Sequence, residues 1–408
     1  MSVSPLSPHA LCATLDKLCS RTEPIALAVS GGADSLCLTL LTHQWAQKYH
    51  IPCVALTFDH KWRPESAKEA AQVKKWLAKY GIEHHTLTFA GTPAKTRKEE
   101  RARQARYQAL TDWCRQHHIA TLLIAHNKED QAETFLLRLA RGSGVDGLSA
   151  MHPITFFDNI RLVRPLLAYS HQQLCATLKQ TFHQRWIEDP SNQDTQYERV
   201  RLRQAQDILS NLGLTPHFIA LSAKRLQRVR TCLETLTQDF MNTHARRHPA
   251  GFLRIDKKAF DTAPEEIRLR ILVRAIEQVG GTIIGMEQAE SLLTKLNRYM
   301  TLGRCQIGIY QGGLYIAPEF DKMPSEKQVV KGKRTLWHNF AVTLDQNALI
   351  GPLGNRLKVK GMPAFVKKTL PAIFSEQHKL LCVPHLDFYA ENAHIKCTIT
   401  LRGHHEEN

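Results

Sequence analysis

The first two hundred residues predict an α/β fold, a doubly wound and mostly parallel sheet, and two observations support it. Short, almost continuous apolar runs alternate with longer segments of helical length, which is the pattern of consecutive βαβ units. The apolar runs also lack polar alternation, as expected for parallel strands covered on both faces. Beyond about residue 201 the pattern changes to basic helices and then to short alternating strands. A helical domain and a small α+β C-terminal domain are therefore expected after the sheet.

The elements of the α/β part alternate along the chain. Apolar runs predict five strands, and segments with apolar residues three or four positions apart predict the helices between them. The strands are expected at 25–29, 53–58, 84–89, 121–125 and 160–163. The helices are expected at 36–49, 66–80, 98–116 and 129–139.

The second half is expected to contain several helices before its strands begin. Residues 201–250 have a helical pattern and carry eight Lys or Arg against three acids. Two more amphipathic helices are expected at 264–279 and 286–297, followed by strands around a Gly-Gly turn from Gly303 onward. We expect three domains, which cover residues 1–205, 206–320 and 321–408.

Composition and charge narrow the class of protein. The 408 residues include 54 Lys or Arg and 38 Asp or Glu, and this surplus of +16 favours a polyanionic partner, with nucleic acid as the first candidate. A hydrophobic share of 43% excludes a mostly disordered chain. We find no apolar run of membrane-spanning length and no signal-peptide pattern, so we expect no membrane span and a cytoplasmic location. The oligomeric state is left open, a dimer included.

One motif, Ser30-Gly31-Gly32-Ala33-Asp34-Ser35, stands between a predicted strand and a predicted helix. Free N–H groups and the dipole at a helix start favour a phosphate, and glycines let the backbone approach it closely. Asp34 would repel that phosphate unless a cation such as Mg²⁺ bridged the two. A plain helix N-cap with a glycine turn is the alternative. We favour the phosphate site because the complete motif follows an apolar strand near the start of an α/β domain.

The motif resembles the pyrophosphate loop (PP-loop) of the N-type ATP pyrophosphatases, whose fold is adenine nucleotide alpha hydrolase-like and which transfer AMP to an oxygen acceptor. Further segments are similar in order and spacing to the tRNA(Ile)-lysidine synthetase family, specifically over 24–205 and more loosely beyond. These segments are Asp59–Ser66 (DHKWRPES), Ala102–Tyr107 (ARQARY), Ala125–Thr134 (AHNKEDQAET), Arg141–Leu148 (RGSGVDGL) and 188–203.

The sequence departs from that family at a few positions. The family usually has A-H-H-x-D-D-Q-x-E-T, whereas Asn127 replaces the second His and Glu129 the first Asp. Val200 stands where Asn is common, and Lys61-Trp62 where Gly-Leu is usual. The other polar residues of the main segment are kept, namely His126, Asp130, Glu133 and Thr134.

The resemblance implies a two-step reaction on RNA. ATP would adenylate the C2 oxygen of the wobble cytidine of an isoleucine tRNA with a CAU anticodon. The ε amine of free L-lysine would then attack C2, AMP would leave, and lysidine would remain. The implied cofactors are ATP and Mg²⁺.

Resemblance and spacing together assign the site residues. Those expected to be catalytic are Asp34, His126, Asp130, Glu133 and Arg103. Those expected to bind ATP are Ser30, Gly31, Gly32, Ala33, Asp34, Ser35, Arg106, Gly142 and Gly144, and Asp34 is the expected metal ligand.

Helical spacing supports two of these groups. Arg103 and Arg106 are three positions apart, so they share a helix face and can reach one anion, unless they form a solvated charged face. Asp130 and Glu133 share a face and are expected to hold lysine's ammonium groups or to activate its amine. The alternative is a pair of acids that favour a helix N-terminus. His126 is expected to contact ATP or the base, with a packed core histidine as the alternative.

Two basic regions form the expected tRNA track. One is the helical stretch 201–250, and the other is 346–375, which has five bases and no acid. Phosphate contacts there would give affinity without sequence choice. The expected tRNA-binding residues are Arg201, Arg203, Lys224, Arg225, Arg356, Lys358, Lys360, Lys367 and Lys368.

Three rival functions fit the sequence less well. A PP-loop enzyme that thiolates tRNA normally needs paired or catalytic cysteines, and the ten cysteines here form no C-x-x-C pair. A GMP or asparagine synthetase would lack the basic C-terminal half. A non-catalytic RNA-binding protein would not be expected to keep the PP-loop motif intact.

Overall fold

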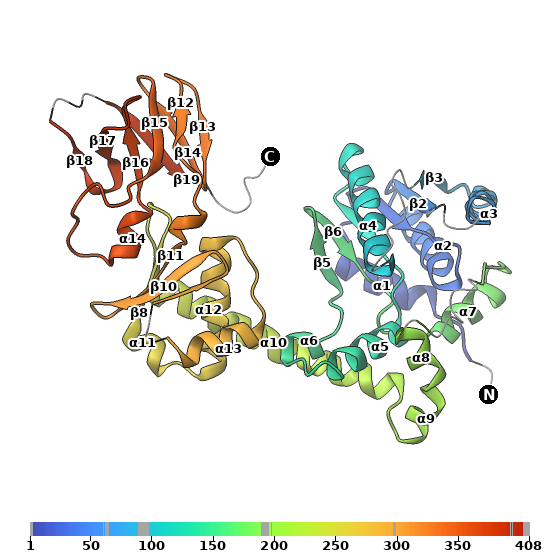
Figure 1. Ribbon diagram of the computed structural model, residues 1–408. Helices are drawn as coiled ribbons and strands as arrows, with labels where there is room; N and C mark the ends of the chain where they lie inside the picture. The colour runs from blue at the N-terminus through green and yellow to red at the C-terminus, as the bar shows by residue number, and fades with distance from the viewer. Residues whose placement is uncertain are drawn as a thin grey trace. The chain divides into compact units, whose positions relative to one another are not determined.

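The chain forms two compact units in the computed structural model, Met1–Arg230 and Thr231–Asn408, which are considered separately (Figure 1). The structure describes residues 3–59, 61, 65–88, 98–188, 196, 198–296, 299–391, 393 and 395–402, without the side chains of 98–100 and 102. Parts of the segments 59–66 and 188–203, the strand end at Phe89 and the helix end at Asn297 therefore lie outside the described residues.

The N-terminal unit is built on a six-stranded sheet of order β3-β2-β1-β4-β6-β5. Five strands run parallel, and β5 pairs with β6 in the antiparallel sense. This confirms the predicted fold class, while β5 was not predicted. The strands are β1 Ile25–Ala28, β2 Cys53–Asp59, β3 Glu83–Thr88, β4 Thr121–Leu123, β5 Ile154–Phe157 and β6 Ile160–Val163.

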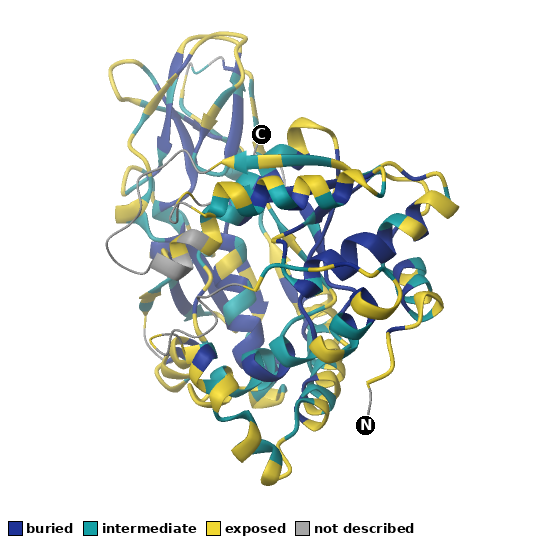
Figure 2. Cartoon of the chain, turned by 90° about the vertical axis from the view of Figure 1, so that its right-hand side faces the viewer, coloured by how far each residue is buried: buried dark blue, intermediate teal, exposed yellow. Residues whose placement is uncertain are grey.

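Helices cover both faces of this sheet because successive strand residues point to opposite sides. Leu27 packs in one core with α1, α2, α3 and α7, whereas Ala26 packs in a second core with α4. In Figure 2, buried residues follow the strands and the inner faces of the helices. The helices of these layers are α1 Pro8–Leu18, α2 Ala33–Lys48, α3 Ser66–Ala78, α4 Lys98–Gln116 and α7 His171–Gln180.

Further helices belong to the same unit. They are α5 Lys128–Leu139, α6 Val145–Leu148, α8 Glu198–Gln204 and α9 Gln206–Asn211. The long helix α10, Pro216–His244, begins in the N-terminal unit and ends in the C-terminal one. The predicted helical pattern of 201–250 is wrong after His244, because 245–247 form strand β7, which pairs with β8.

The C-terminal unit is mainly antiparallel. A five-stranded sheet, β7-β8-β11-β10-β9, packs against α12 and α13, and sheets β12-β15-β16-β17-β18 and β13-β14-β19 follow. The first group comprises β7 Ala245–Arg247, β8 Leu253–Asp256, α11 Lys257–Thr262, α12 Glu265–Gly280, α13 Met286–Thr294, β9 Met300–Leu302, β10 Cys305–Tyr310 and β11 Gly313–Pro318. The second comprises η2 Phe320–Lys322, β12 Lys327–Val329, β13 Thr335–Trp337, β14 Phe340–Leu344, β15 Ala348–Pro352, α14 Ala364–Lys368, β16 Pro371–Phe374, β17 Leu380–Val383, η3 Pro384–Leu386, β18 Phe388–Tyr389 and β19 Cys397–Leu401.

One hydrophobic core joins the two groups of strands. Phe252 and Tyr315 of the first group pack with Phe365 and Leu370 of the second. The division into domains 1–205, 206–320 and 321–408 stays a prediction. Among the described residues, no helix has the length and apolar character that a membrane crossing requires.

Candidate active site

The PP-loop lies between β1 and α2, as the motif predicts. Its backbone conformation is fixed by contacts within the N-terminal unit. Gly32 is the N-cap of α2 and Gly31 adopts a positive φ of 88°. A Cβ atom on Gly31 would lie 2.8 Å from side-chain atoms of both Val73 and Ile187, so glycine is required there by conformation and by space. The N–H of Ile187 donates to the carbonyl of Gly31 at 2.9 Å.

The two serines of the motif close the loop. The hydroxyl of Ser35 donates to the carbonyl of Gly32 at 3.0 Å and accepts from the N–H of Ser30 at 3.2 Å. The two hydroxyls are 3.1 Å apart. The loop is therefore preorganised at the start of α2, where N–H groups and the helix dipole favour an anion.

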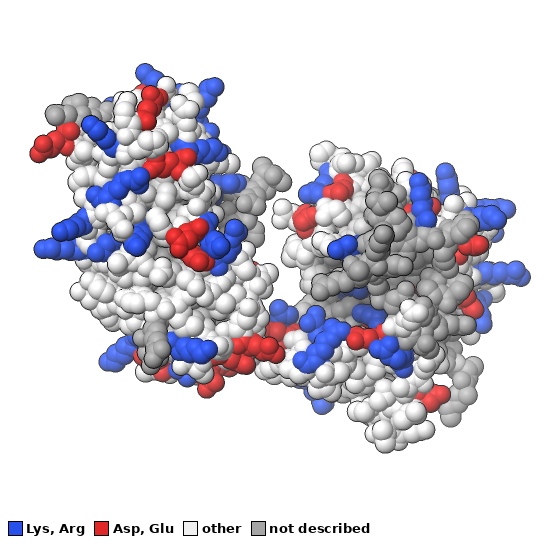
Figure 3. All heavy atoms as spheres, viewed as in Figure 1, with Lys and Arg blue, Asp and Glu red and all other residues white. Residues whose placement is uncertain are grey.

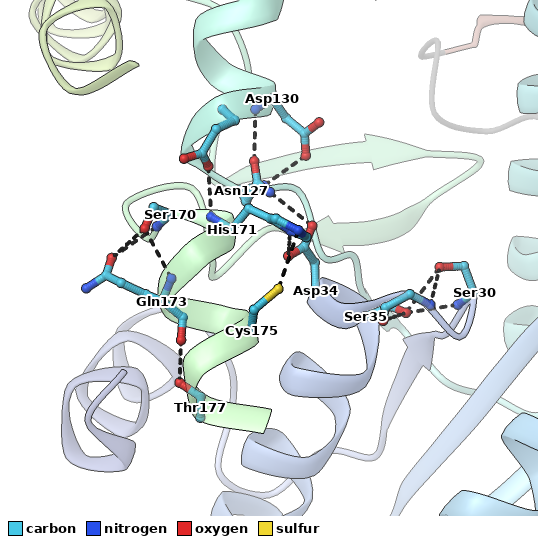
Figure 4. Close-up of polar contacts among 12 residues, drawn as sticks. Ser30, Asp34, Ser35, Asn127, Asp130, Ser170, His171, Gln173, Cys175 and Thr177 are labelled. Atoms are coloured by element: carbon cyan, nitrogen blue, oxygen red, sulfur yellow. Dashed lines mark hydrogen bonds and ion pairs between the residues drawn. The ribbon is translucent and has the colours of Figure 1, made fainter. Parts of the chain in front are cut away.

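Asp34, the second residue of α2, is the point where three elements meet (Figure 4). Its Oδ2 accepts from Nδ2 of Asn127, at the start of α5, at 3.0 Å. Its Oδ1 lies 2.8 Å from Nδ1 of His171, at the start of α7. This contact with Asp34 is the main reason that the pKa of His171 rises to about 10, so the pair is ionic at neutral pH.

Asn127, which departs from the family pattern, has a clear structural role. Its Oδ1 accepts from the N–H of Asp130 at 2.9 Å, and its own N–H donates to Oδ2 of Asp130 at 3.0 Å. This reciprocal capping box starts α5. Glu129, the second departure, accepts from the N–H of His171 at 2.9 Å and so links α5 to α7.

Asp130 and Glu133 lie together on α5, as predicted, and face two arginines of α8. Glu133, 5% exposed, accepts from Nε of Arg203 at 2.6 Å and from its Nη2 at 3.3 Å. Arg199 lies 3.7 Å from Asp130 and 3.6 Å from Glu133. Burial raises the pKa of both acids, and the arginines oppose that rise.

The expected lysine patch is thus occupied by guanidinium groups of the chain itself. Arg203 was predicted on the tRNA track, and the structure places it against Glu133. Thr134, next to Glu133 in the chain, has a buried hydroxyl without a hydrogen-bond partner among the described residues.

Arg103 and Arg106 form a separate cationic group near the neutral His126. Both arginines lie over the ring of Tyr107, at 5.3 and 5.5 Å from its centre. His126 is 9% exposed, and its Nδ1 accepts from Nε of Arg164 at 3.3 Å. Burial first, and then the charges of Arg164, Arg103 and Arg106, lower the pKa of His126 well below its usual value.

The glycines after α5 shape a turn. Gly142 has a positive φ of 68° and Gly144 is the N-cap of α6. Arg141 of the same segment pairs with Glu198 at 2.6 Å. That Gly142 and Gly144 bind the nucleotide stays a prediction.

The residues predicted to bind tRNA are mostly at the surface. Lys224 and Arg225 are exposed on α10, as are Lys358 and Lys360 in the loop before α14, while Lys367 and Lys368 are half-buried. Arg356 contacts Oε1 of Glu326 at 2.8 Å, and Arg201 donates to the carbonyl of Gln196 at 3.1 Å. Lys and Arg side chains are scattered over the visible face of the C-terminal unit (Figure 3).

Sequence reasoning missed three members of the site. His171 and Ile187 come from segments in which no motif was recognised, and Arg164 follows a strand that was predicted without a site residue. The one available signal was position, because Arg164 comes directly after β6, at the carboxyl end of a parallel strand.

Comparison with known proteins finds a matching family model and relatives that cover most of the chain. Residues 9–209 match the family model described as PP-loop domain. The chain is 33% identical to the tRNA(Ile)-lysidine synthase of Wolbachia pipientis wMel, with 92% of each chain covered. It is 38% identical to the enzyme of that name from Bradyrhizobium sp. (strain BTAi1 / ATCC BAA-1182), covering 71% of this chain and 82% of the relative.

A solved structure shows a weaker likeness. The U34-tRNA thiolase NcsA from Methanococcus maripaludis covers 54% of this chain and 77% of its own at 19% identity, with a TM-score of 0.46, a likeness too low to distinguish one activity from another. The family is shown instead by the similarity to the Wolbachia and Bradyrhizobium proteins, which extends over most of the chain. The chain belongs to the tRNA(Ile)-lysidine synthase family, with a PP-loop domain in its N-terminal half.

Proposed function

We propose that this chain is the ATP-dependent ligase that converts the wobble cytidine of a CAU-anticodon isoleucine tRNA to lysidine, releasing AMP and pyrophosphate. The observation that supports this best is the meeting at Asp34 of the PP-loop helix with α5 and α7, in a chain of this family. The acids of α5 lie beside this point, so one edge of the sheet offers both an ATP site and an amine site.

The PP-loop would bind the phosphates of ATP through its N–H groups, and Asp34 fits the role of a Mg²⁺ ligand. Its side chain is 24% exposed. No cluster of three or more possible protein ligands occurs among the described residues. Mg²⁺ commonly binds to one or two carboxylates together with substrate phosphates, which suits Asp34. When bound, the ion would neutralise phosphate charge.

Asp130 and Glu133 would form the lysine site. Two guanidinium groups already lie against these carboxylates, which supports a preference for cations there. In our proposal, the ammonium groups of lysine replace one or both arginines. Because burial raises the pKa of both acids, either could take the proton that the attacking amine must lose.

The basic surface would hold the tRNA. Exposed Lys224 and Arg225 on α10, with Lys358 and Lys360 in the acid-free stretch, offer phosphate contacts. The surplus of +16 is consistent with a polyanion as large as tRNA.

The test is AMP release measured with purified protein, ATP, Mg²⁺, isoleucine tRNA and lysine. We expect sustained release only when all are present. The matched control is the same tRNA with its wobble cytidine changed to uridine, which should support none. Sustained release that ignores lysine, or that continues with the uridine tRNA, would contradict the proposal.

A further inference from the structure

A buried arginine outside the recognised motifs lies beside the candidate active site. Arg164 directly follows β6 and is 7% exposed. Its Nε donates to Nδ1 of His126 at 3.3 Å, and its Nη1 donates to the carbonyl of His152 at 3.1 Å and to Oγ1 of Thr155 at 2.9 Å. All three acceptors are neutral.

No acid balances this charge in the part of the chain that the structure describes. None of the ion pairs found there involves Arg164 or Arg106. The groups that act on Arg164 are instead Tyr107 and Arg103, and Arg106 acts on the adjacent His126. A buried guanidinium stays protonated, and burying it beside like charges is costly unless an anion arrives.

The contact with Arg164 also fixes the protonation of His126. A guanidinium has no acceptor, so Nδ1 of His126 must be the acceptor and cannot carry a proton. Because His126 is neutral, its single proton is on Nε2. His126 therefore offers a hydrogen-bond donor to the site and cannot act as a base through Nδ1.

We infer that a phosphate-binding site lies at the carboxyl ends of β4 and β6 and is formed by Arg164, His126 and Arg106. This inference rests on the proposed function, because the bound phosphates would belong to the substrates of that reaction. Arg164 has two roles in this site. It supplies part of the positive charge, and it positions His126 so that Nε2 of His126 can donate a hydrogen bond. Two substrates bring phosphates here, the triphosphate of ATP and the RNA backbone beside the target base.

The first experiment needs no variant. Wild-type protein labelled with ¹⁵N-histidine should show His126 with a bare Nδ1 and a protonated Nε2 at pH 7. Titration with pyrophosphate should shift the Nε2 resonance. A protonated Nδ1, or an Nε2 resonance that no phosphate compound moves, would overturn the inference.

The second experiment distinguishes the two sources of phosphate. Arg164→Gln is compared with Arg161→Gln, a control on the same strand β6, for binding of α,β-methylene-ATP with Mg²⁺ and for binding of isoleucine tRNA. If the triphosphate is the ligand, we expect the nucleotide to bind about tenfold more weakly with tRNA binding unchanged. If the RNA backbone is the ligand, tRNA binding should weaken. The slope of log affinity against log salt should then decrease in magnitude by about one, as expected for the loss of one phosphate contact.

Unchanged binding of both ligands in a folded Arg164→Gln protein would overturn the inference. Arg164→Lys keeps a charge but loses the fixed donor to Nδ1, so it should restore part of the binding while the ¹⁵N signature of His126 still changes. Lysidine formation by the wild type is measured separately, so failure here leaves the proposed function standing.

Discussion

The two units of this protein present polar residues in different ways. In the N-terminal unit, the side chains of the site come from the starts of helices that follow neighbouring parallel strands, so Asp34, Asn127 and His171 meet although they are far apart in sequence. In the C-terminal unit, antiparallel sheets spread the basic residues over the surface, and Arg356 is partly engaged by Glu326. The first arrangement suits a reaction at one point, whereas the second suits a large anion that contacts many points.

This difference predicts how the units respond to substitution. Single changes in the N-terminal unit should alter chemistry or affinity sharply, because each side chain has several partners in a buried setting. Changes in the C-terminal unit should act additively and weakly, through salt-dependent binding.

The largest effect is expected for Asp34→Ala. It removes the carboxylate that contacts Asn127 and His171 and that we assign to Mg²⁺. AMP formation should fall at least about 100-fold while the unfolding midpoint changes little. Asp16→Asn, which loses a contact with Arg21 in the same unit, is the control and should stay active. Normal turnover by Asp34→Ala would remove Asp34 from the chemistry.

The next effect is expected for Glu133→Gln. The KM for lysine should rise about 10- to 100-fold, because a buried carboxylate that pairs with a cation is lost. The affinity for ATP should stay the same. Glu198→Gln breaks the exposed ion pair with Arg141 and serves as the control. If both variants keep the wild-type KM, the lysine site lies elsewhere.

A smaller effect is expected in the C-terminal unit. Lys358→Glu combined with Lys360→Glu should weaken tRNA binding. The slope of log affinity against log salt should decrease in magnitude by between about 1 and 2. Lys258→Glu with Lys295→Glu, exposed bases of the same unit outside the acid-free stretch, is the control. An equal loss in both pairs would mean that this stretch has no special role.

The smallest effect concerns the pH dependence of stability. Asp34 raises the pKa of His171 to about 10, above the unfolded value near 6.5. The stabilisation by this pair is therefore complete below pH 6.5 and is lost as the pH rises through about 10. Because His171 is half-exposed, solvent screening limits the stabilisation by this pair to about 1 kcal/mol or less.

The stabilisation by the His171–Asp34 pair is measured by chemical unfolding of His171→Gln and of the wild type from pH 6 to 10.5. The difference in unfolding free energy should be greatest at pH 6 and vanish near the upper end. His9→Gln, an exposed change on α1, should show no such trend. A difference that grows with pH would contradict the assignment.

The sequence was sufficient for the parallel part of the fold and for the PP-loop, because both leave local patterns. It was not sufficient for β5, although a signal was present. Asp158 and Asn159 join β5 to β6 with φ values of 46° and 63°, the positive pair that a two-residue hairpin turn needs. Ile154–Phe157 is short and has no clear alternation of buried and exposed residues, so the turn was the only clue.

The site was predictable only where its residues share an element. Asp130 and Glu133 could be paired from their helical spacing, and Asn127 three residues before Asp130 is the spacing of a capping box. The contacts of Asp34 with His171 and of His126 with Arg164 span 137 and 38 residues. No periodicity in one sequence encodes such pairs, because the order of the strands brings them together.

The most direct test of the account is mass spectrometry of nucleosides from an isoleucine tRNA with a CAU anticodon after incubation with the protein, ATP, Mg²⁺ and lysine. We predict that the wobble cytidine is replaced by lysidine, and that the product carries the isotope label when labelled lysine is supplied. An unmodified cytidine, or a modified nucleoside without the lysine label, would contradict the central claim.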